Sequence, residues 1–139
     1  MNASTETQGS AVVLVAHGSP DPDWRRPLEQ LHARLTADLA QPVALAYLAQ
    51  EPTVAEVVAE LVAGGHRHLI VIAALLSPGG RHVKRDIPSA VDEARAAHPD
   101  AHIELVPGAL GDDDGVIAAL ATATLSRLQP ILRPSSTPD

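Results

Sequence analysis

The sequence predicts an α/β fold in which a four-stranded parallel sheet carries helices on both faces. Strand-like and helix-like segments alternate along the chain, which is typical of parallel strands joined by helical crossovers. The strand-like segments are nearly continuous apolar runs, as expected for strands buried on both faces. A length of 139 residues fits one domain.

The first half of the chain supplies two strand and helix pairs. Residues 11–16 form an apolar run, and leucines at helical spacing predict a helix over about residues 25–40. Residues 43–48 follow as a second strand. Thr53 and Glu56 then form a capping box for a second helix, which Gly64 and Gly65 end.

The second half repeats the pattern. Residues 68–76 form the third and most apolar strand, and Ile87, Val91 and Ala94 predict a helix after it. Residues 102–106 predict the fourth strand. Acidic residues 112–114 then favour the start of a last helix, whose apolar residues are Val116, Ile117, Leu120, Leu125 and Leu128.

These elements predict a flexible N-terminus over residues 1–10, a single domain over 11–129 and a flexible C-terminal tail over 130–139. Right-handed crossovers favour the flavodoxin-like strand order 2-1-3-4. Ligands of such sheets bind outside the carboxyl ends of the strands, at the switch point between strands 1 and 3. His17 and His82 both lie in the segments that follow these two strands, and the topology brings those segments side by side.

Composition excludes several classes of function. The formal net charge of -7 and the scarcity of aromatic residues argue against a nucleic-acid partner. The chain has no cysteine, which excludes disulfides and thiolate metal sites. The first ten residues do not resemble a signal peptide, and no run approaches the ~20 apolar residues of a membrane span. We therefore expect a soluble, cytoplasmic protein that does not associate with membranes.

A basic segment after strand 3 contrasts with this acidic composition. Arg81, Lys84 and Arg85 surround His82, and this grouping indicates an acidic ligand, although most charge clusters are solvated surface. Asp86 either caps the following helix or holds a neighbouring base in place. Ser19 follows strand 1 near the same end of the sheet. A role as a turn residue explains it at least as well as a role in ligand binding.

Two neutral imidazoles from neighbouring loops suit a divalent first-row ion such as cobalt, nickel or iron. The alternative is that His17 and His82 each cap or pack a loop. The remaining histidines read as surface or structural residues: His32, His66, His68, His98 and His102. Ala16 stands where a histidine phosphatase has an arginine, and the hydrolase, phosphate-loop and dinucleotide motifs are absent.

Two motifs together resemble those of the short CbiX/SirB-type sirohydrochlorin chelatases. They are Ala16-His17-Gly18-Ser19 after strand 1 and Ser77-Pro-Gly-Gly-Arg-His82-Val-Lys-Arg-Asp86-Ile-Pro88 after strand 3. The resemblance implies a chelatase-like fold and insertion of a divalent metal, cobalt first and iron or nickel as alternatives, into sirohydrochlorin. The metal is a substrate here, and no organic cofactor is expected. His17 and His82 match the family's metal-binding histidines, and a homodimer with a shared cleft is implied.

The end of strand 2 departs from the family pattern. The family commonly has Phe-Leu-Glu before Glu-Pro, where this chain has Tyr47-Leu48-Ala49-Gln50-Glu51-Pro52. We expect His17, His82 and Glu51 to be catalytic, with Glu51 or one imidazole accepting pyrrole protons, and Ser19, Arg81, Lys84 and Arg85 to bind substrate carboxylates. Two alternatives stay open: a CbiX-like metal- or tetrapyrrole-binding protein without turnover, and a dimeric scaffold without either ligand.

Overall fold

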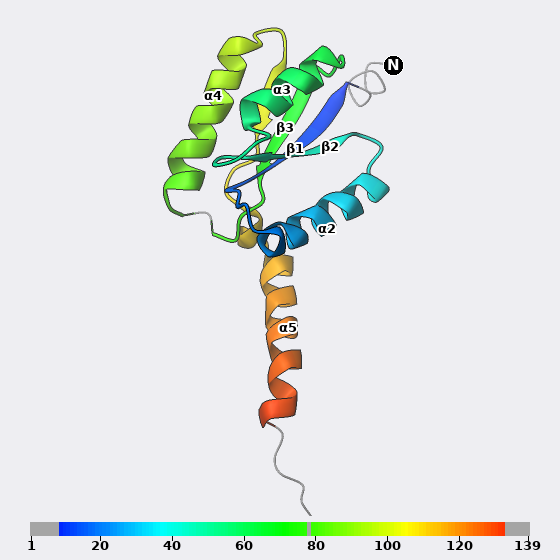
Figure 1. Ribbon diagram of the computed structural model, residues 1–139, viewed down its shortest axis with the longest axis vertical. Coiled ribbons are helices and arrows are strands. Elements are labelled where there is room, and N and C mark those ends of the chain that lie inside the picture. The colour runs from blue at the N-terminus through cyan, green and yellow to red at the C-terminus, as the bar shows by residue number, and fades with distance from the viewer. Residues whose placement is uncertain (1–8, 78, 133–139) are drawn as a thin grey trace, which may run out of the picture.

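The computed structural model describes residues 9–77 and 79–132, and its four strands form one parallel sheet in the order β2-β1-β3-β4. This order confirms the predicted fold class and topology. The strands are β1 (Ser10–Ala16), β2 (Val43–Tyr47), β3 (His68–Ala73) and β4 (His102–Leu105). Figure 1 shows the sheet with its helices around it.

One face of the sheet carries the hydrophobic core. Because side chains alternate along a strand, every second residue of β1 and β3 points to this face, where α3 (Val54–Ala63) and α4 (Ile87–Ala97) cover it. The fully buried members of this aliphatic core include Val13, Val58, Leu69, Ile87 and Val91. The core anchors the ends of β1 and β3, from which the candidate site residues follow.

The other face is covered by α2 (Pro22–Asp38), which packs against β2. Leu14 of β1 is buried there, but Ile70 and Ile72 of β3 remain half-exposed. This face is therefore covered over β2 and β1 and more open over β3 and β4.

Two element boundaries differ by three residues from the sequence prediction. The helix predicted from about residue 25 begins at Pro22, because the Asp21 side chain accepts a hydrogen bond from the Asp23 amide and proline suits the first helical turn. β3 ends at Ala73 rather than residue 76. The carbonyl of Leu75 instead accepts a hydrogen bond from the Gly111 amide, which fixes the next part of the chain against this segment.

Gly111 lies in the short 3-10 turn η2 (Leu110–Asp112), which precedes α5 (Asp114–Leu132). A Cβ atom at this position would overlap the backbone carbonyl of Leu76. Only glycine allows this close approach, so the approach sets where α5 begins.

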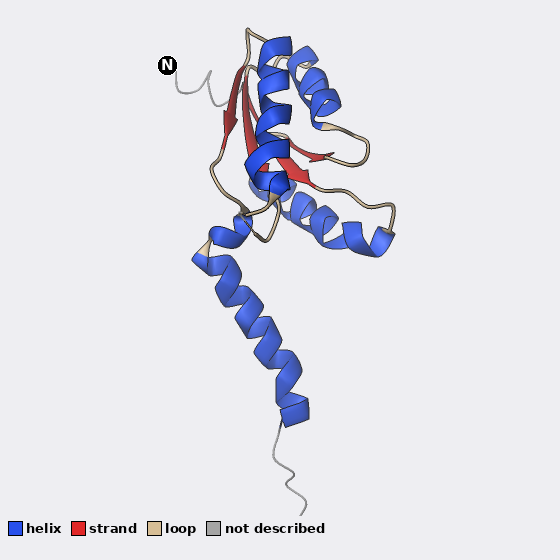
Figure 2. Cartoon of the chain, turned by 90° about the vertical axis from the view of Figure 1, so that its left-hand side faces the viewer, coloured by secondary structure: helices blue, strands red, loops and turns tan. Residues whose placement is uncertain are grey.

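The last helix extends away from the sheet (Figures 1 and 2). It includes residues 130–132, which corrects the prediction that a flexible tail begins at residue 130. None of its residues is buried. The apolar side chains that it exposes are Ile117, Leu120, Leu125, Leu128, Ile131 and Leu132. These positions recur at helical spacing and form one stripe, which we call the α5 stripe.

Within the described ranges 9–77 and 79–132, α5 is the one helix that is long and apolar enough to cross a membrane. Length and composition alone are weak grounds for a membrane span, because core helices of soluble proteins have the same properties. At the N-terminal side, Ser10 already belongs to β1 and is buried, which corrects the expectation that it is part of a flexible end. Residues 1–8 and 133–139 of the predicted termini lie outside the described residues.

Candidate functional site

His17 is the first residue after β1, the strand that pairs with both β2 and β3. Its side chain is exposed, and its Nδ1 lies 3.0 Å from the carbonyl oxygen of Gly18. A carbonyl oxygen only accepts, so Nδ1 carries the hydrogen in this contact and Nε2 keeps its lone pair. Nε2 is therefore the atom of this imidazole whose lone pair could bind a metal ion.

Gly18 fits the loop against the end of β2. Its φ is +102°, and a Cβ atom there would lie 3.1 Å from Cβ of Tyr47 and 3.3 Å from Cβ of Gln50. The His17 carbonyl also accepts a hydrogen bond from the Ala49 amide at 2.8 Å. The loop after β1 is thus held against the end of β2 and the residues that follow it. A side chain at Gly18 would disturb both segments.

Tyr47 lies under this loop and is 6% exposed. Burial, with a smaller contribution from the Glu29 carboxylate, raises the pKa of the Tyr47 phenol above its ordinary value. Its ring lies 6.4 Å from that of Trp24 on α2, so the phenol belongs to the packing between β2 and α2.

The sequence predicted His82 in a loop, but the structure places it in the first turn of a helix. It begins a π-helical turn, η1 (His82–Asp86), that continues directly into α4. Its Nδ1 lies 2.9 Å from Oδ2 of Asp86, one turn further on. An ionised carboxylate only accepts, so this contact also leaves the lone pair on Nε2. Of its two predicted roles, Asp86 therefore holds the base, and it makes no capping hydrogen bond to α4.

The structure brings the two histidines together. Their ring centroids lie 4.5 Å apart and the ring planes meet at 66°. The expected juxtaposition of residues distant in sequence is therefore present. Each imidazole uses Nδ1 to hold its orientation, and this is the arrangement that proteins use to prepare Nε2 atoms for a metal ion.

The basic residues lie around this pair but differ in their contacts. Nε of Arg81 lies 3.7 Å from Oδ1 of Asp86, and its side chain is 74% exposed. Lys84 and Arg85 are exposed on η1. The resulting surface offers positive charge beside the two imidazoles, which suits an anionic ligand.

Ser19 and Glu51 have less direct positions. The Ser19 hydroxyl accepts a hydrogen bond from the Asp21 amide at 3.1 Å, which is a turn role at the start of α2. Glu51 is exposed, two residues beyond Ala49. In the described part of the chain its carboxylate makes no hydrogen bond or ion pair with His17 or His82.

A family model named CbiX matches residues 11–126 of the chain. The chain belongs to the CbiX family. A crystal structure of a CbiX protein from Marinobacter aquaeolei VT8 has a TM-score of 0.76 at 24% identity, covering 87% of this chain and 98% of that one. A search of curated proteins found no match.

Two solved structures of SirB are also similar to this CbiX-family chain. The sirohydrochlorin chelatase SirB from Bacillus subtilis subspecies spizizenii in complex with cobalt has a TM-score of 0.73 at 27% identity over 84% of this chain. SirB from Bacillus subtilis with Fe3+ has a TM-score of 0.72 at 26% identity over 90% of it. The chain covers only 50% and 48% of those two chains, so it spans about half their length.

Sequence reasoning grouped His68 and His102 with surface or structural histidines, but the structure places them beside each other and beside Glu104. The available signal was the alternation His102-Ile103-Glu104 on a strand next to one that begins with His68. This signal indicates a cluster only once the register of β3 and β4, which pairs His68 with His102, is known.

Proposed function

We propose that this CbiX-family protein is a sirohydrochlorin chelatase that inserts a divalent metal ion, cobalt first and iron or nickel as alternatives, into sirohydrochlorin. The observation that carries the proposal is the His17 and His82 pair, with both Nδ1 atoms engaged and both Nε2 atoms able to hold a metal ion. The likeness to cobalt-bound SirB supports it. The route served is cobalamin or sirohaem biosynthesis, and the location is the cytoplasm.

In the proposed reaction, the metal ion replaces two protons on the pyrrole nitrogens of the macrocycle. The Nε2 atoms of His17 and His82 hold the ion while leaving coordination positions open, so pyrrole nitrogens displace the remaining ligands in turn. The released protons pass to an imidazole as it leaves the metal, or to Glu51, which reaches solvent beside this edge. No electron transfer is required, because the metal keeps its charge.

The basic surface supplies the second part of the proposal. Arg81, Lys84 and Arg85 receive the carboxylates of the substrate, and Ser19 contributes a hydroxyl at the same rim. Arg81 is drawn toward Asp86 in the structure, so Lys84 and Arg85 are the freer of the three charges. Contacts of this exposed kind weaken as salt concentration rises.

The test combines purified protein, sirohydrochlorin and Co(II), Ni(II) or Fe(II), with the visible spectrum of the macrocycle as readout. We expect faster insertion than without protein, and a return toward the protein-free rate for His17→Ala and for His82→Ala. A His98→Ala variant, altered at the end of α4, serves as the control. No acceleration with any of the three metals would reject the proposal.

A second candidate is metal or tetrapyrrole binding without turnover. Ala49 stands where the family commonly has glutamate, and Glu51 makes no contact with the imidazole pair, which favours this reading over catalysis. Calorimetric binding of Co(II) that depends on His17 and His82, together with no spectral change of the macrocycle, would identify it.

The proposal includes a homodimer in which the α5 stripe packs against a second copy. Six large apolar side chains on one stripe are between 37% and 76% exposed, and a second copy that covers them would remove this apolar surface from water. We expect a dimer by sedimentation analysis and a monomer for Leu120→Glu combined with Leu125→Glu. Ser126→Glu, on the side of α5 opposite the stripe by helical spacing, is the control, and a monomeric wild type would contradict this part.

A further inference from the structure

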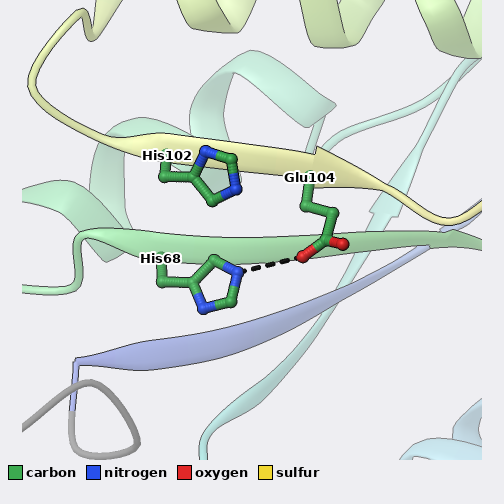
Figure 3. A group of neighbouring side chains, drawn as sticks. All are labelled: His68, His102 and Glu104. Carbon is green, nitrogen blue, oxygen red and sulfur yellow. Dashed lines mark hydrogen bonds and ion pairs between the residues drawn. The ribbon is translucent and has the colours of Figure 1, made fainter.

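Three potential metal ligands lie together near the amino-terminal ends of β3 and β4 (Figure 3). His68 begins β3 and His102 begins β4, and the two residues are partners in the parallel register. Glu104 lies two positions after His102, so strand alternation places it on the same face. All three side chains therefore project from one face of two neighbouring strands.

The distances within this His68-His102-Glu104 cluster are short. Nε2 of His68 lies 3.1 Å from Oε2 of Glu104, and the two imidazoles are stacked with centroids 5.1 Å apart. One ligand atom from each residue lies within 4.8 Å of the others. Tetrahedral zinc with bonds of about 2.0–2.2 Å needs ligand atoms about 3.4 Å apart. His102 and Glu104 are exposed, so their side chains have room to rotate toward such a geometry.

A further group orients His68. Its Nδ1 lies 3.2 Å from the hydroxyl oxygen of Ser10, a buried residue of β1. A hydroxyl can donate or accept, so it accommodates either position of the ring hydrogen. When Nδ1 donates to Ser10, Nε2 turns its lone pair toward Glu104. A cation between the two then has a fixed imidazole and a carboxylate as ligands.

This cluster is separate from the His17 and His82 pair. In a parallel sheet all strands begin at the same end and finish at the opposite end. β1 runs from Ser10, beside His68, to Ala16, directly before His17. Seven residues at about 3.3 Å each place the two sets roughly 20 Å apart. One ion cannot bridge them.

We propose that His68, His102 and Glu104 form a second divalent-cation site for a borderline ion of the zinc, nickel or cobalt class. Two imidazoles and one carboxylate suit these ions, whereas calcium and magnesium prefer oxygen ligands. Three protein ligands leave at least one coordination position open. Because β4 has four residues and, among the described strands, pairs with β3 alone, the bound ion joins this edge strand to its neighbour and stabilises it.

The test uses Zn(II) and calorimetry on a variant that lacks the first pair, His17→Ala with His82→Ala. We expect this variant to retain one Zn(II) site and to gain thermal stability with Zn(II). Adding His102→Asn or Glu104→Gln weakens binding at least about tenfold and removes the thermal shift. His66→Asn, two residues before His68 and outside the cluster, leaves both unchanged.

Circular dichroism verifies that each variant is folded. A folded pair variant that binds no Zn(II), or that binds it equally after His102→Asn, overturns the proposal. The Zn(II) measurement does not involve sirohydrochlorin. Failure here therefore leaves the proposed chelatase function untouched, and failure of the chelatase assay leaves this site untouched.

Discussion

The carboxylate of Asp86 accepts a hydrogen bond from Nδ1 of His82 at 2.9 Å, across one turn of the π-helical segment η1. This contact decides which nitrogen of His82 can bind a metal ion. The other carboxylate oxygen of Asp86, Oδ1, lies 3.7 Å from Nε of Arg81. One carboxylate thus contacts both the imidazole and a basic side chain. A π-helical turn at this position accords with the frequent occurrence of such turns at functional sites.

Asp86→Asn is expected to weaken Co(II) binding at the His17 and His82 pair by about 10- to 100-fold, because the imidazole loses its charged partner. The measurement is calorimetric titration with Co(II) in a His102→Asn background, which removes the second proposed site. Asp92→Asn is the matched control, since Asp92 pairs only with Arg95 among the described residues of the same helix. Equal affinity of both variants would show that Asp86 does not support His82.

Lys84→Gln combined with Arg85→Gln is expected to raise the KM for sirohydrochlorin about 2- to 30-fold, since each of the two exposed ion pairs contributes ~0.2–1 kcal/mol. The loss of positive charge should also reduce the salt dependence of KM. Steady-state insertion assays at two ionic strengths measure both effects. Arg127→Gln on α5 tests whether any lost cation has the same effect, and an equal result for it would refute local recognition.

Gly111→Ala is expected to destabilise the fold by about 1–3 kcal/mol, because the new methyl group would overlap the backbone carbonyl of Leu76. The free energy of unfolding from denaturant titration measures this effect. Gly79→Ala is the control, since a Cβ atom there would meet no described atom within 4 Å. Equal stabilities would mean that the turn before α5 shifts without cost.

Stability is expected to fall as pH rises above about 10, in part through Tyr47. Burial raises the pKa of this phenol in the folded state. The folded state then binds more protons than the unfolded state in this range, so the free energy of unfolding decreases with pH. Tyr47→Phe should flatten this part of the pH profile. Because Tyr47 is the only tyrosine, phenolate absorbance reports its titration directly, and ionisation at the ordinary value would contradict the expectation.

Prediction from the sequence succeeded where a local pattern has one structural meaning. Apolar runs and helical spacing located the strands and helices, and crossover handedness limited the strand order. It was less accurate at element ends, because hydrogen bonds such as that from Gly111 to the Leu75 carbonyl depend on distant parts of the chain. It also predicted a last helix correctly while leaving open what that helix packs against.

By itself, the sequence determined the α/β class, the order of elements, and the positions of His17 after β1 and of His82 between β3 and α4, because these follow from periodicity and chain connectivity. The tertiary structure alone decided how the two rings meet, which nitrogen of each is hydrogen-bonded, and that α5 leaves the sheet with its stripe exposed. It also brought His68, His102 and Glu104 together. Contacts of this kind depend on strand register and side-chain direction, which no local pattern specifies.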